Sequence, residues 1–156
     1  MSASLTRRSL VGTIIGFVAL PVANAYALVE SMIVHRDPSC GCCEAWAAHI
    51  RGAGINATIV NETNMNTVKS RLGVPSALVS CHTAEISGYV IEGHVPAKAI
   101  LQLLRDKPDA IGLAAPGMPV GSPGMESGGA KDVFEVVAFG VAGSSIYGRY
   151  RGEEPV

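Results

Sequence analysis

The sequence lacks the features that mark nucleic-acid-binding, hard-cation-binding and membrane-spanning proteins. Its 156 residues contain no basic stripe and no interleaving of basic with aromatic residues, which argues against nucleic acid as a partner. They contain no cluster of aspartate and glutamate that resembles a site for a hard cation. The apolar run at residues 10–20 is about half as long as a transmembrane helix must be, so we expect no stable membrane span in the mature protein. The chain is nevertheless 48% hydrophobic, enough for one compact domain with its own core.

Residues 1–27 have the layout of a secretory signal peptide. Arg7 and Arg8 precede the apolar run, and small residues that end at Ala25 and Ala27 follow it, so we expect cleavage after one of these alanines. The arginine pair also resembles a twin-arginine export signal. Cleavage removes two of the 12 basic residues and none of the 13 acidic ones, which leaves a net charge of −3. In the oxidising compartment that an exported protein meets, its four cysteines are expected to pair unless something such as a metal holds them.

The pattern of the mature chain predicts strands and helices in a definite order. The expected strands are residues 32–35, 55–60, 82–86 and 89–92, and the expected helices are residues 44–51, 65–72 and 97–105, with one further turn at 77–79. Asn64 is the expected cap of the second helix, and Ile100, Leu101 and Leu104 form the apolar stripe of the third. This order is that of thioredoxin, with a parallel first pair of strands and an antiparallel hairpin. We therefore predict an α/β fold with a thioredoxin-like mixed sheet flanked by helices.

The last third of the chain has weaker signals. Residues 111–130 are rich in glycine and proline and are predicted to form a loop, because Pro119 and Pro123 exclude a helix there. Residues 133–139 and 145–150 are predicted to form two strands joined at Gly143, which make an appended C-terminal β-hairpin. The predicted domain thus spans residues 28–150, and residues 151–156 are expected to be a tail.

The cluster Cys40-Gly41-Cys42-Cys43 places three thiols within four residues at the start of the first expected helix. Backbone N–H groups at a helix start lower the pKa of a nearby thiol, and the resulting thiolate serves both disulfide exchange and soft-metal binding. A dithiol exchanger needs only Cys40 and Cys43, whereas a metal cluster also makes use of Cys42. The remaining interpretation is that these cysteines form structural disulfides, although the chain is long enough to have a core without them.

Cys81 and His94 are the residues most clearly expected to approach this cluster. In the thioredoxin order the third strand starts beside the head of the first helix, so Cys81 is expected to face Cys40 and Cys43. The alternative is that Cys81 is an ordinary buried residue, and the adjacent His82 can equally be a surface residue of the strand. His94 follows the hairpin and is expected at the same end of the sheet.

Met118 and Met125 are unusual because they lie in the loop rich in glycine and proline, where methionine has no helical face to fill. They are either metal ligands or residues that pack over the core. His35 and His49 are expected to have structural roles. The candidate metal ligands are therefore Cys40, Cys42, Cys43, Cys81, His94, Met118 and Met125. Thiolate, thioether and imidazole together favour Cu(I), whereas zinc has little use for methionine, and a set of this size is sufficient for more than one copper ion with bridging thiolates.

Longer motifs resemble a known family. These are Cys40-Gly41-Cys42-Cys43, Trp46 with His49, residues 73–75, residues 80–83, residues 88–96 and residues 117–126. Together they resemble the CopG-type copper-resistance proteins, long described as a metal-binding domain of unknown function, over about residues 31–150. The resemblance implies a thioredoxin-like fold, a periplasmic location, copper binding through the cysteine cluster with nearby sulfur and imidazole groups, and a role in copper tolerance alongside other periplasmic copper-handling proteins.

Two other functions stay open from the sequence. One is a thiol–disulfide oxidoreductase of thioredoxin type that depends on Cys40 and Cys43 and has no metal role. The other is a non-catalytic domain with two disulfides. Whether the protein is an enzyme, acting on copper or on thiols, is left undecided by the residues alone.

Overall fold

The computed structural model of the protein describes residues 30–156. The predicted signal peptide, residues 1–27, lies outside the described residues. Among the helices of residues 30–156, none is both long enough and apolar enough to cross a membrane.

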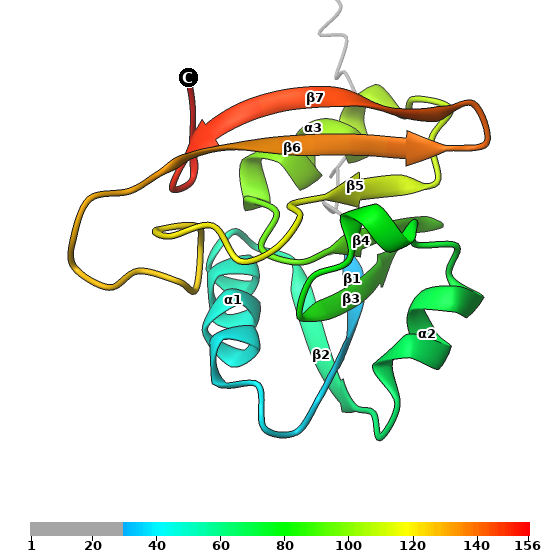
Figure 1. The fold of residues 1–156 in the computed structure, drawn as a ribbon, viewed down its shortest axis with the longest axis horizontal. Helices are drawn as coiled ribbons and strands as arrows, with labels where there is room; N and C mark the ends of the chain where they lie inside the picture. The colour runs from blue at the N-terminus through cyan, green and yellow to red at the C-terminus, as the bar shows by residue number, and fades with distance from the viewer. Residues whose placement is uncertain (1–29) are drawn as a thin grey trace, which may run out of the picture.

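This part of the chain forms one mixed sheet of eight strands in the order β2-β1-β3-β4-β5-β6-β7-β8 (Figure 1). The strands are β1 (Ser31–Arg36), β2 (Asn56–Asn61), β3 (His82–Ile86), β4 (Tyr89–Glu92), β5 (Gly112–Ala114), β6 (Val133–Gly140), β7 (Gly143–Arg151) and β8 (Glu154–Pro155). Three α-helices, α1 (Gly41–Gly52), α2 (Met65–Arg71) and α3 (Ala97–Asp106), and a 3-10 turn, Ser76–Leu78, flank the sheet. The predicted mixed α/β sheet flanked by helices is therefore confirmed.

The pairings of the first half follow the predicted order. β1 pairs with β2 in parallel and with β3 in antiparallel register, and β3 and β4 form the tight hairpin through Ser87 and Gly88. The side chain of Asn64 accepts a hydrogen bond from the Thr67 N–H at the start of α2, as expected for a capping residue. β3 and β4 have the predicted bounds, because a hairpin with a two-residue link fixes where both of its strands end.

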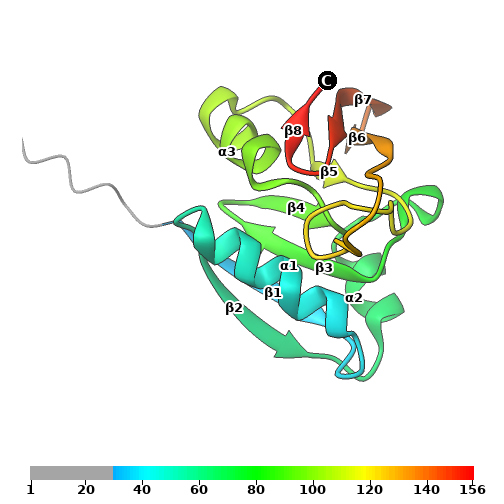
Figure 2. The same ribbon diagram turned by 90° about the vertical axis from the view of Figure 1, so that its left-hand side faces the viewer.

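The helices cover both faces of the sheet. α1 and α2 lie on opposite sides of β1 and β3, and α3 lies on the same side as α1 (Figures 1 and 2). Trp46 and Ile50 of α1 are fully buried in the larger core cluster, together with Leu103 of α3. The predicted apolar stripe of α3 was wrong at one residue: Leu101 is 40% exposed, and Leu103 faces the sheet in its place.

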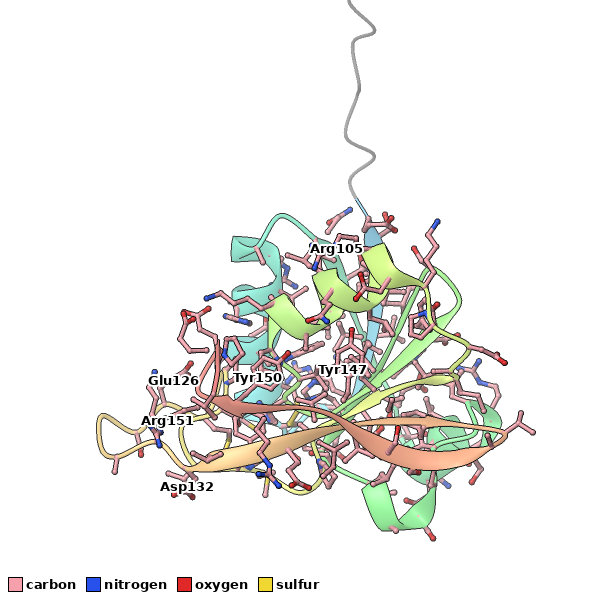
Figure 3. All side chains as sticks on the ribbon, turned by 90° about the horizontal axis from the view of Figure 1, so that it is seen from above. Arg105, Glu126, Asp132, Tyr147, Tyr150 and Arg151 are labelled. Atoms are coloured by element: carbon pink, nitrogen blue, oxygen red, sulfur yellow. A yellow bond between two sulfur atoms is a disulfide. The ribbon has the colours of Figure 1, made fainter. Side chains whose placement is uncertain are left out.

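The loop predicted at residues 111–130 contains a strand that the sequence did not indicate. β5 runs parallel to β4 and antiparallel to β6, so β6 and β7 continue the same sheet. Gly112 is required here, because a Cβ at this position would lie 1.8 Å from the Val90 carbonyl oxygen. Tyr147 and Tyr150 of β7 lie on the side of the sheet that faces α3 (Figure 3). The segment expected to be a tail includes β8, which pairs with the end of β7.

Candidate metal centre

Four cysteine sulfurs converge at the start of α1. The Sγ atoms of Cys40, Cys42, Cys43 and Cys81 all lie within 4.8 Å of one another. Cys40 occupies the capping position before α1, and Cys42 and Cys43 follow in its first turn. Cys81 directly precedes β3, which pairs with the β1 strand that leads into the cluster. The topology thus brings Cys81 to the other three cysteines, as the strand order predicts.

Two of the four cysteines are joined. Cys40 and Cys43 form a disulfide with their Cα atoms 5.6 Å apart. Cys42 and Cys81 form no disulfide in the described part of the chain, and both are partly buried. The Cys42 Sγ lies 3.6 Å from the Cys40 Sγ, so a thiol is in direct contact with the disulfide. The structure therefore presents an oxidised C-x-x-C pair beside two thiols, rather than four reduced cysteines.

His94 is oriented toward the cluster by a backbone contact. Its side chain is fully buried, and Nδ1 donates a hydrogen bond to the Pro123 carbonyl oxygen at 2.7 Å. The neutral ring therefore carries its proton on Nδ1, which leaves the lone pair of Nε2 free to accept a proton or bind a metal. Nε2 lies 3.1 Å from the Cys81 Sγ. A ligating histidine is commonly oriented by a hydrogen bond from its other ring nitrogen in this way.

His82 is a candidate ligand that the sequence analysis did not select. It is fully buried, whereas a surface position was the open alternative, and its Nδ1 lies 3.3 Å from the Cys81 Sγ. Its Nε2 is buried and has no hydrogen-bond partner among residues 30–156. Cys81, His82 and His94 form a second group whose ligand atoms lie within 4.8 Å of one another. The available signal was the adjacent pair Cys81-His82, but a histidine at the start of a strand can equally face solvent, which is the alternative that the sequence left open.

Trp46 packs against this second group. Its ring centroid lies 4.3 Å from that of His82, and its indole N–H donates to the Val95 carbonyl oxygen at 2.9 Å. The rings of His82 and His94 meet edge to face, with their centroids 5.0 Å apart. The imidazoles are therefore fixed between the helix and the sheet by packing as well as by hydrogen bonds.

Burial controls the protonation of the site. It raises the pKa of the Cys81 thiol to about 12, with further contributions from the charge and hydrogen bond of Cys42. Burial also lowers the pKa of His94, against the opposing effects of the Pro123 carbonyl and Glu126. It lowers the pKa of His82 well below its usual value, and the positive charges of His94 and Lys69 act in the same direction. At neutral pH the metal-free site therefore holds a Cys81 thiol and two neutral imidazoles.

The segment with the two methionines packs over the site. Besides the Pro123 contact to His94, Gly124 lies so close to α1 that a Cβ there would be 2.6 Å from the backbone nitrogen of Trp46 and 2.9 Å from the Cys42 carbonyl oxygen. Its φ of +83° is a second reason for glycine at this position. Met125, the next residue, is partly buried, and Met118 is 56% exposed. The role of both methionines as ligands stays a prediction.

The other two histidines lie outside the cluster and have partners elsewhere. The ring of His35 lies between Glu62 and Glu85, with contacts of 2.7 and 3.1 Å. His49 Nε2 accepts a hydrogen bond from the backbone N–H of Ala97, the first residue of α3. These contacts connect elements of the fold, which agrees with the structural roles expected for both residues.

The donor chemistry fits a soft metal ion. Four sulfurs and two imidazoles gather in a partly buried site, and each imidazole nitrogen that faces Cys81 lies close enough for both groups to bind one ion. The His82 Nε2, which lacks a partner among the described residues, can carry the ring proton while Nδ1 faces the ion. Fold and site thus define a class: a small mixed α/β domain with a cysteine–histidine cluster that can hold a metal ion.

Within that class, the chain belongs to the family of CopG copper-resistance proteins. It is 49% identical to a solved structure described as "Copper resistance protein copG- Form 1", with a TM-score of 0.73, and 48% identical to Form 2, with a TM-score of 0.74. Each alignment covers 78% of this chain and 98% of the other. Residues 78–125 match the family model "Protein of unknown function, DUF411". No curated protein matches the chain. The resemblance inferred from the motifs is confirmed.

Proposed function

We propose that the protein binds Cu(I) in a copper-resistance role. The observation that carries the proposal is the convergence of four cysteine sulfurs within 4.8 Å, with Cys81 shared between this group and the two imidazoles. Thiolates and imidazoles are soft to intermediate ligands, and among the metals available outside the cytoplasm they favour Cu(I). The 49% identity to a protein named for copper resistance supports copper over zinc.

The proposed ligands are Cys40, Cys42, Cys43, Cys81, His94, Met118 and Met125, and the geometry adds His82 to this set. Because Cys81 belongs to both groups, its thiolate can bridge two ions, which supports binding of more than one copper. Full use of the cysteines requires a dithiol reductant: its two thiols become a disulfide, and the Cys40–Cys43 disulfide becomes two thiols. Copper binding then displaces the thiol protons.

We further propose a periplasmic location and a thioredoxin-like core. The four strands β2-β1-β3-β4, with the cysteine cluster at the start of α1, support the thioredoxin-like assignment. The arginine pair and apolar run near the N-terminus support export. An oxidising compartment also agrees with a C-x-x-C pair in the disulfide form.

The test is to quantify copper and free thiol in the same sample, prepared and reduced without oxygen. We expect copper to bind with the loss of titratable thiols, and both the Cys42→Ser and Met125→Leu variants to bind Cu(I) more weakly or in smaller number. His35→Gln is the matched control, because the His35 ring pairs with Glu62 and Glu85 and belongs to neither ligand group. If both site variants keep the full stoichiometry and affinity of the unaltered protein, the multi-ligand site is wrong.

The second candidate is a thiol–disulfide oxidoreductase. It is favoured by the Cys40–Cys43 disulfide at the start of α1, with the Cys42 thiol 3.6 Å from Cys40. Such an enzyme would reduce or isomerise disulfides in a way that depends on Cys40 and Cys43 and is indifferent to Met118→Leu and Met125→Leu. An insulin-reduction assay on Cys40→Ser, Cys43→Ser, Met118→Leu and Met125→Leu separates the two functions.

A further inference from the structure

A buried ion pair lies on the face of the sheet opposite α1. Lys69 of α2 is 5% exposed, and Glu92 at the end of β4 is fully buried. The Lys69 ammonium donates to Glu92 Oε1 at 2.5 Å and to the Thr83 hydroxyl at 2.9 Å. Thr83 in turn donates to Glu92 Oε2 at 2.6 Å. Each of these three side chains hydrogen-bonds both of the others.

A buried ion pair is weak evidence for a role in stability. Removing two charges from water costs several kcal/mol, and replacing a buried ion pair by apolar residues of similar volume is often neutral or stabilising. The pair also lies outside the copper ligands proposed above. The position of the Lys69–Glu92 pair relative to the proposed ligands therefore indicates what the pair does.

Glu92 connects the two segments that carry the ligands. Its Oε1 accepts a second hydrogen bond, at 2.6 Å, from the backbone N–H of Ser80, the residue before Cys81. Glu92 itself lies two residues before His94. The intervening Gly93 donates to the His82 carbonyl oxygen, and a Cβ at Gly93 would lie 2.5 Å from the side chain of Ser80. The carboxylate thus sets how far Cys81 lies from His94.

We propose that Glu92 is a positioning residue of the copper centre, which acts by holding the Ser80 N–H, while Lys69 and Thr83 hold the Glu92 carboxylate in place. This inference rests on the proposed function. In this role Glu92 acts through the oxygen that accepts the hydrogen bond from Ser80, and not through its negative charge. A side chain of similar length that keeps an oxygen at this place preserves the spacing between the Cys81 Sγ and the His94 Nε2, and one without an oxygen releases Ser80 and the segment that follows it.

Two double variants that differ only at residue 92 test this. K69M/E92Q removes both charges and keeps an acceptor for Ser80, and K69M/E92L removes both charges and the acceptor. Cu(I) affinity is measured on the reduced proteins in competition with a chromophoric Cu(I) chelator, and melting temperature is measured in parallel. We expect K69M/E92Q to bind within about threefold of the unaltered protein, and K69M/E92L to bind about tenfold or more weakly, with a melting temperature no lower than that of K69M/E92Q.

A copper-free readout separates this proposal from the proposed function. In the metal-free reduced protein, release of Ser80 should make Cys81 react faster with iodoacetamide in K69M/E92L than in K69M/E92Q, as followed by peptide mass spectrometry. Equal affinities and equal alkylation rates in the two double variants overturn the positioning role and leave copper binding intact. Failure of the unaltered protein to bind Cu(I) overturns the proposed function instead. If K69M/E92L does not fold, E92D, which keeps the charge but withdraws the oxygen by one methylene, replaces it with the same expected loss.

Discussion

The protonated state of Cys81 predicts how Cu(I) affinity depends on pH. Burial, reinforced by Cys42, raises the pKa of this thiol to about 12, so it keeps its proton throughout the range from about pH 7 to about pH 9. The pKa of His94 is lowered by burial, so its ring is neutral throughout the same range and adds no proton of its own. Binding of Cu(I) at Cys81 must therefore displace one proton from its thiol. The contribution of Cys81 is about a tenfold gain in affinity per pH unit, or about a hundredfold from pH 7 to pH 9.

The assay is a competition titration with a chelator of known pH dependence, on the reduced protein and on Cys81→Ser. A serine hydroxyl does not ionise in this range, so the plot of log affinity against pH should be shallower by one unit in the variant. His35→Gln is the matched control, because His35 belongs to neither ligand group and its replacement leaves the proton of Cys81 to be displaced. Equal slopes for the unaltered protein and Cys81→Ser would refute the reasoning. In that case the thiolate absorbance of the metal-free protein distinguishes two explanations. Absorbance from Cys81 between about pH 7 and about pH 9 means that the thiol was already ionised, and its absence means that Cys81 is not a ligand.

Three other predictions concern the single residues Met125, Trp46 and His49. Met125→Leu should weaken Cu(I) binding by about tenfold in the same titration, in line with loss of a soft ligand, and an unchanged affinity would exclude Met125 from the ligand set. Trp46→Phe should lower the free energy of unfolding by about 1–3 kcal/mol in urea, because it leaves the buried Val95 carbonyl without its donor. Burial lowers the pKa of His49, so as the pH falls this histidine is protonated in the unfolded chain before it is protonated in the folded one. The stability from its bond to Ala97 should be complete above about pH 6.5 and fall as the pH decreases below it, and a melting-temperature profile of His49→Gln that runs parallel to that of the unaltered protein would contradict this.

Local sequence signals predicted the first half of the fold well. Strands at 82–86 and 89–92 were predictable because β-branched and apolar residues flank a Ser-Gly link that admits only a tight turn. The start of α2 was predictable because asparagine is a favoured N-cap residue, whose side-chain oxygen accepts a hydrogen bond from a backbone N–H of the first turn. Such signals are contained within a few residues, so tertiary contacts do little to alter them.

Strand β5 shows where local signals fail. Gly112–Ala114 contains one large apolar residue and no β-branched one, and its pairing depends on β4 and β6 on either side of it. A glycine in this place looks like a loop signal, although here it permits the backbone of Val90 to approach. The two-residue strand β8 is similar, because it is defined only by its pairing with β7.

The candidate site was predictable in its sulfur ligands and less so in its imidazoles. Cysteines are rare enough that four in one chain, three of them within four residues, indicate a common site, and the strand order predicted the approach of Cys81. His82 was missed because a histidine at the start of a strand can equally lie at the surface, and only its packing against Trp46 of α1 shows that it is buried. The Lys69–Glu92 pair gave no signal at all, since charged residues at such spacing are ordinarily solvated.

The two candidate functions use the same atoms, and the residues around them decide which one the site favours. A disulfide exchanger needs an accessible first sulfur and benefits from no third thiol, since a neighbouring thiol in contact with the disulfide can attack it and divert the reaction. A copper site needs several soft donors held close together in fixed orientations. Here His94 is oriented by Pro123, and Cys81 follows the backbone N–H held by Glu92. An exchange reaction at Cys40 and Cys43 does not require these contacts, whereas each of them fixes a donor that a metal ion can bind.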